Sequence, residues 1–156
     1  MIDYSEMLSR IEYLNGMYED EKDGIRAQMI AKLAAIEVGG WIEEFFDASL
    51  IHCIAKEKPE CLDEIKEELK RVYSFNYPDL RKMIIKIIGI GRMYEVEKSN
   101  PRQVEMLKSA LGKIKNERDK AAHTSVSIST VLAAPSVLKH EFVYAFENAV
   151  RLFEVI

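Results

Sequence analysis

The feature that most constrains this chain is its apolar periodicity, because hydrophobic residues recur every three to four positions along nearly its whole length. That spacing places them on one face of an α-helix, whereas a half-buried strand needs strict alternation. Only seven glycines and four prolines interrupt the pattern in 156 residues. The sequence therefore predicts an all-α protein, a single compact bundle of five to six helices that spans residues 1–156 as one domain.

The pattern divides into helical segments at glycine, proline and polar turns. A first helix is expected over residues 4–18 and a second over 25–54, with Gly39 and Gly40 in its middle. Two adjacent glycines at that point either kink the helix or let another helix approach closely. Pro59 ends the second helix and suits the start of a third, which is expected to run through Val72.

A fourth helix is expected to open at Pro78, and its end is ambiguous because Gly89 and Gly91 follow closely. The fifth has the clearest start signal in the chain: Asn100 is placed to cap it, Pro101 fits its first position, and Gln103 is placed to complete a capping box. Its apolar stripe consists of Val104, Leu107, Leu111 and Ile114. A polar, β-branched loop should follow, and then a last helix that begins near Pro135 and Ser136.

Composition excludes several functional classes. The net charge of −4 argues against a protein that holds long nucleic acid by charge alone, so any RNA chemistry needs a small local site or a partner. Cys53 and Cys61 lack metal-ligand spacing and are expected to pack in the interior. We expect no metal and no cofactor. Without a signal-peptide pattern or an apolar stretch long enough to span a bilayer, we expect a cytoplasmic protein that does not enter membranes.

One group of residues, at the end of the fifth predicted helix, carries a recognisable chemistry. Arg118 continues the apolar stripe, where an arginine is costly unless its guanidinium has an anionic partner. His123 follows five residues later, where a helix C-terminus favours the protonated imidazole. An arginine that binds phosphate beside a titrating histidine is what metal-free RNA cleavage needs.

That chemistry also predicts a homodimer. A base must take the proton from the ribose 2′-hydroxyl while an acid protonates the leaving 5′-oxygen, and one histidine is poorly suited to both transfers in a single step. A second copy of the same helix, brought by a two-fold axis, supplies the other histidine and arginine.

The segment from Arg118 to His123 resembles the Arg-x4-6-His motif of HEPN domains, in which a polar residue directly follows the arginine, as Asp119 does here. The layout is also similar to that family: a small all-α domain with the motif near the end of a late helix, then a loop and a closing helix. The resemblance in layout covers nearly the whole chain, but those six residues are its only specific motif.

The resemblance implies a metal-independent endoribonuclease that forms 2′,3′-cyclic phosphates and is active as a homodimer with RNA as substrate. Family members often act as toxins or defence effectors, with an antitoxin or nucleotidyltransferase as a possible partner. It implies that Arg118 and His123 are catalytic, with Asp119 as the supporting polar residue. The neighbouring residues then expected to bind substrate are Lys115, Lys120 and Thr124.

Two departures from the family pattern concern charge and modification. Asparagine commonly follows the arginine in the family, and Asp119 instead adds negative charge beside a phosphate. One toxin subgroup has a tyrosine two residues after the histidine. Ser125 stands at that position here, so modification of a tyrosine there is not expected.

Other interpretations of the same residues remain open at this stage. In one interpretation, Arg118 only pairs with a carboxylate such as Glu105 or Glu141, and His123 only caps the helix through its final carbonyls. The chain is then a non-catalytic HEPN-like module that binds RNA, nucleotide or a protein partner, or a helical bundle that serves association alone. His140 opens the last predicted helix and is expected at the surface, with a place facing the same site as the alternative. His52 and Trp41 are expected in the core.

Overall fold

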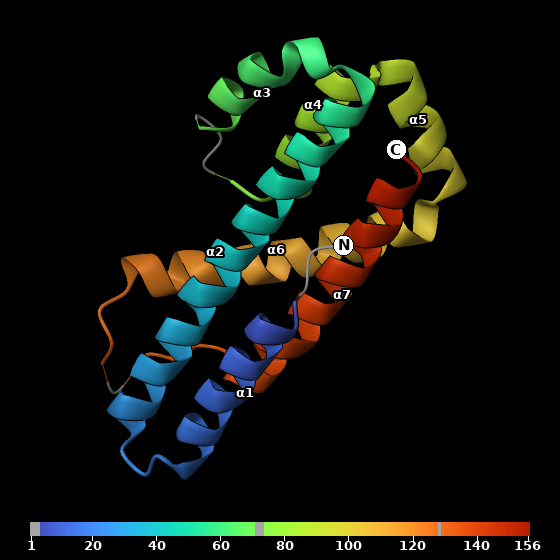
Figure 1. Cartoon of the computed structure of the whole chain (residues 1–156). Helices are drawn as coiled ribbons and strands as arrows, with labels where there is room; N and C mark the ends of the chain where they lie inside the picture. The colour runs from blue at the N-terminus through green and yellow to red at the C-terminus, as the bar shows by residue number, and fades with distance from the viewer. Residues whose placement is uncertain (1–3, 71–73, 128) are drawn as a thin grey trace.

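A computed structural model describes residues 4–70, 74–127 and 129–156. These residues form seven α-helices and one short 3₁₀-helix, with no strand among them (Figure 1). The prediction of an all-α protein is confirmed, although the helices outnumber the expected five to six. They are α1 (Ser5–Asp20), α2 (Gly24–Glu57), η1 (Pro59–Cys61), α3 (Leu62–Leu69), α4 (Tyr77–Ile88), α5 (Ile90–Ser99), α6 (Pro101–His123) and α7 (Pro135–Glu154).

The 34-residue helix α2 is the central element of the fold. Helices α1, α6 and α7 pack against it and α7 also packs on α1 and α6, while η1, α3 and α4 contact its C-terminal half (Figure 1). Buried apolar side chains from all seven α-helices form one continuous core. In α6 the predicted stripe is buried, and Leu107, Leu111 and Ile114 have no exposed surface. This packing fixes the rotation of α6 and so the direction of Arg118.

Of the two alternatives expected at Gly39 and Gly40, a kink or the close approach of another helix, the structure shows the second. Helix α2 continues through both glycines, and Arg118 of α6 lies against Gly39. Asp23 caps the start of α2, where its carboxylate accepts hydrogen bonds from the backbone N–H groups of Ile25 and Arg26. Val72, the expected end of the third helix, lies outside the described residues. Within them, α3 ends at Leu69.

The sequence prediction missed helix α5. Gly89 has a positive φ of 82°, which ends α4 and starts a separate helix at Ile90. The expected cap at Asn100 was also wrong. The Asn100 side chain makes no hydrogen bond to the start of α6 and instead donates one to the carbonyl of Val96 in α5. The expected start of α6 at Pro101 is nevertheless confirmed, as is the start of α7 at Pro135.

Three further side chains test the expected core. His52 is exposed, so its assignment to the interior was wrong: it lies on the solvent side of α2, beside the buried Cys53. Trp41 is half-buried and packs against the core, and so does Cys61. Across the described parts of the chain, no helix has both the length and the apolar character that crossing a bilayer demands.

Candidate functional site

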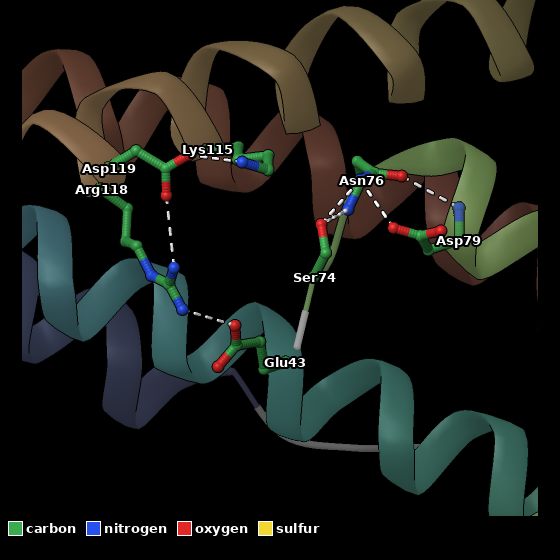
Figure 2. Close-up of polar contacts among 7 residues, drawn as sticks. All are labelled: Glu43, Ser74, Asn76, Asp79, Lys115, Arg118 and Asp119. Atoms are coloured by element: carbon green, nitrogen blue, oxygen red, sulfur yellow. Dashed lines mark hydrogen bonds and ion pairs between the residues drawn. The ribbon is translucent and has the colours of Figure 1, made fainter. Parts of the chain in front are cut away.

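Arg118 extends from α6 to α2 (Figure 2), and its guanidinium also lies near Phe75 in the segment before α4. Its Nη2 donates a 2.9 Å hydrogen bond to Oε1 of Glu43, and its Nη1 lies 3.3 Å from Oδ1 of Asp119. The guanidinium carbon lies 5.8 Å from the centre of the Phe75 ring. The Arg118 side chain keeps 31% of its surface exposed, so it is held on one side and open to solvent on the other.

Arg118 can reach α2 because Gly39 has no side chain. A Cβ atom at Gly39 would lie 2.8 Å from Cγ and 3.4 Å from Cβ of Arg118, and the first of these distances is shorter than real contacts allow. Gly39 and Glu43 are four residues apart and share a face of α2. The glycine therefore admits the stem of the arginine, and the glutamate one turn later receives its charge.

The sequence analysis foresaw an anionic partner for Arg118 but named the wrong residues. Glu105 pairs with Lys108 and Glu141 pairs with Lys113. Neither Glu43 nor Phe75 was proposed as part of the site. The only sequence signal for Glu43 is its position one helical turn after Gly39, and that signal has meaning only once α6 is known to cross α2 there.

The lysines expected to bind substrate are already paired with carboxylates. Lys115 forms an ion pair with Asp119, and Lys120 forms one with Glu117. Asp119 therefore lies between two cations, Lys115 and Arg118 (Figure 2). The hydrogen bond from Lys115 is the largest factor that lowers the pKa of Asp119, and Arg118 lowers it further, so this carboxyl is ionised at neutral pH.

For two carboxyl groups on α2, Glu43 and Asp47, the pKa is raised and not lowered. Burial raises the pKa of Glu43, an effect that Arg118 partly opposes and that the neighbouring Asp47 reinforces. Burial also raises the pKa of Asp47. Both residues line a small pocket with Phe75 and Asp79, so the surroundings of Arg118 on this side are acidic. An anionic ligand of Arg118 must displace or outcompete Glu43.

His123 is the last residue of α6 and its side chain is exposed. Five residues separate it from Arg118, which is about 140° around a helix, so the two side chains leave α6 in different directions. Among the described residues no hydrogen bond or ion pair involves the imidazole, and the cap of this helix end is the backbone N–H of Thr124. The structure thus groups Arg118 with Asp119 and Lys115, and leaves His123 outside that group.

Two candidates remain, Thr124 after the end of α6 and His140 on α7. The backbone N–H of Thr124 donates to the carbonyl of Lys120, and its own carbonyl accepts a 3.0 Å hydrogen bond from Nζ of Lys32 on α2. His140 is exposed on α7, where its ring centre lies 4.6 Å from that of Tyr144. His140 is therefore a surface residue, as expected.

No group of three or more His, Cys, Asp and Glu side chains with the arrangement of a metal site occurs in the described residues. Comparison with known proteins places the chain in no group: no family model, no curated protein and no solved structure matches it.

The close approach at Gly39 predicts a difference between two adjacent glycines. Gly39→Ala should destabilise the fold by about 1–2 kcal/mol, because the cost of overpacking against Arg118 exceeds the gain in helix propensity. Gly40→Ala is the matched control: no atom lies within 4 Å of its added Cβ, and it should stabilise the protein by about 0.5–1 kcal/mol. Urea unfolding of both variants measures this difference. Equal effects of the two substitutions would contradict the contact between Gly39 and Arg118.

Proposed function

We propose that this protein is a metal-independent endoribonuclease of the HEPN type, and that two copies of the chain share one active site. The observation that carries the proposal is the contrast at the end of α6. His123 has an exposed imidazole with no partner among the described residues, while Arg118 on the same helix has a fixed guanidinium that is still partly open to solvent.

The proposed reaction uses one histidine from each copy. One neutral imidazole accepts the proton of the ribose 2′-hydroxyl as O2′ attacks phosphorus and forms the new O–P bond. The protonated imidazole of the other copy donates its proton to O5′ as the P–O5′ bond breaks. The products are a 2′,3′-cyclic phosphate and a free 5′-hydroxyl. Arg118 stabilises the negative charge on the phosphoryl oxygens in the transition state.

Glu43 and Asp119 have defined roles in this proposal. They hold the guanidinium in place before RNA arrives, so that little reorganisation is needed when the phosphate binds. Glu43 is the partner that the phosphate replaces, and burial already disfavours its charged form. Asp119 remains ionised between Lys115 and Arg118 and orients the arginine from its own helix.

The ion pair between Arg118 and Glu43 favours a second candidate function. An arginine that already has two carboxylate partners meets the requirement for charge compensation by itself. In this alternative the chain is a non-catalytic helical module that binds RNA, a nucleotide or a protein through the same surface. The two proposals differ in whether a phosphodiester bond is broken.

Incubation of the purified protein with total tRNA in EDTA tests the proposal. We expect fragments with 2′,3′-cyclic phosphate and 5′-hydroxyl ends, because the attacking oxygen belongs to the substrate and no metal takes part. The ends are identified by phosphatase and kinase treatment before labelling. Intact RNA at high protein concentration would contradict the proposal, and so would fragments with 3′-hydroxyl and 5′-phosphate ends that appear only with added divalent cations.

A further inference from the structure

The first half of α2 carries large apolar side chains that the fold leaves in solvent. Ile25, Met29, Leu33 and Ile36 expose 36%, 55%, 47% and 43% of their surfaces. Their spacing of four, four and three residues places them on one side of the helix as a continuous stripe, here called the α2 stripe. A helix of a monomer normally turns such a stripe toward its core, so an exposed one indicates a contact surface.

The α2 stripe extends onto α1. Tyr13 and Met17 on that helix expose 71% and 43% of their surfaces. Tyr13 and Leu33 line a common groove between α1 and α2. The apolar surface is thus wider than one helix, as the contact between two folded proteins requires.

The α2 stripe also borders the candidate site. Lys32, which lies between Met29 and Leu33 in the sequence, reaches the carbonyl of Thr124 at the end of α6. The end of α6 therefore lies beside the middle of the α2 stripe. One flank of the stripe faces α6, and the other faces α1, where Glu37 lies 3.8 Å from Arg10.

Two side chains of opposite charge, Arg26 and Glu37, lie on the flank of the α2 stripe that faces α1. Arg26 is exposed and has no ion pair among the described residues, and Glu37 has only its long contact with Arg10. They are 11 positions apart, about three turns, so they point to nearly the same side of α2. They lie near the two ends of the stripe, at similar distances from its middle. Two copies of this surface, placed antiparallel, therefore bring opposite charges together.

We infer that the α2 stripe is the surface on which a second copy of this chain docks, with the two α2 helices antiparallel about a two-fold axis near the middle of the stripe. Ile25 then lies opposite Ile36 of the second copy, and Met29 lies opposite Leu33. Arg26 lies beside Glu37 of the second copy, twice by symmetry. This inference rests on the proposed function, since that function requires two copies of the chain.

The antiparallel arrangement pairs these charges. With the axis perpendicular to the helices, each flank of α2 meets the same flank of its mate, so Arg26 of one copy meets Glu37 of the other at the same height. With the axis parallel to the helices, opposite flanks meet, and Arg26 and Glu37 then both face the flank that carries Lys32. Only the first arrangement gives each Arg26 a carboxylate of the other copy as its partner.

The antiparallel arrangement also completes the site. The two α6 helices end on the same side of the dimer, because equivalent flanks meet. Each ends beside the middle of its α2 stripe, close to the level of the axis. The two α6 ends, each with an exposed His123, thereby lie on one side of the dimer, as the proposed reaction needs.

Sedimentation of single variants tests this surface. The wild type should sediment as a dimer and Leu33→Glu as a monomer, because two carboxylates cannot be buried in the apolar contact. Tyr94→Glu is the control: Tyr94 lies on α5 and exposes 58% of its surface, and this variant should remain a dimer. A monomeric wild type at about 100 µM, roughly a hundredfold above a micromolar dissociation constant, would overturn the inference. A dimeric Leu33→Glu variant would also overturn it.

An exchange of charges tests the antiparallel register without loss of apolar surface. Arg26→Glu and Glu37→Arg should each weaken the dimer at least tenfold, and the double variant should recover most of the affinity. No recovery in the double variant would overturn the register. Circular dichroism confirms the fold of each variant. Failure of these tests leaves the tRNA assay to decide the ribonuclease proposal separately, since a dimer through another surface still cleaves RNA.

Discussion

His123→Ala is expected to lower the rate of RNA cleavage by about 10²- to 10⁴-fold, the usual contribution of a general acid or base. The side chain is exposed and makes no hydrogen bond or ion pair among the described residues, so its loss should leave the fold intact. The melting temperature of the variant should therefore match that of the wild type. Single-turnover cleavage of labelled tRNA in EDTA measures the rate.

His140→Ala is the matched control for this variant. His140 is also exposed and helical, but it lies on α7 against Tyr144. Its replacement should leave the cleavage rate within about twofold of the wild type, as expected for a side chain that takes no part in proton transfer. Equal losses of rate in both variants, or none in either, would remove His123 from the reaction.

Arg118→Ala is expected to lower the cleavage rate by about 10²- to 10³-fold, because the proposed reaction then lacks the cation that would stabilise the transition-state charge. The cost in stability should be only about 1 kcal/mol, since the ion pair with Glu43 is about one-third exposed on both sides and such pairs contribute little. Cleavage assays and urea unfolding of the same preparation measure the two effects.

Glu43→Gln separates a catalytic arginine from a structural one. The amide keeps a hydrogen-bond acceptor for Arg118 but removes the negative charge that competes with phosphate. If Arg118 binds RNA, the variant should keep its activity and show a lower KM. If Arg118 serves only to neutralise Glu43, neither Arg118→Ala nor Glu43→Gln alters cleavage, and the catalytic role is lost.

Helical periodicity was sufficient to predict the central elements, because α2, α6 and α7 each carry apolar residues at helical spacing along their length. It did not show which of the apolar residues in the first half of α2 are buried and which are exposed. It did not reveal α5, because Gly89 and Gly91 do not indicate whether the chain after Ile88 continues as a helix or as a loop. Gly89 could equally have opened a loop, and only its positive φ with a new helix behind it distinguishes the outcomes. The capping signal at Asn100 misled for a similar reason, since its side chain found a nearer acceptor on the preceding helix.

The chemistry of the site was less predictable than its position on α6. The sequence indicated that Arg118 needs an anion, but its partner Glu43 lies 75 residues earlier in the chain. That pairing depends on the crossing of α6 over Gly39, a tertiary contact without a local pattern. The pairing of Lys115 and Lys120 with Asp119 and Glu117 was accessible in principle, because both pairs follow helical spacing.

The central claim is that one ribonuclease site is built from both copies of the chain, and mixed dimers test it most directly. Wild-type and His123→Ala chains are unfolded together in varied ratios, refolded, and assayed for tRNA cleavage in EDTA. If both histidines serve one site, activity follows the square of the wild-type fraction, and an equal mixture keeps about a quarter of the activity. An activity proportional to the wild-type fraction, about half at equal mixture, would show that each chain acts alone and would contradict the shared site.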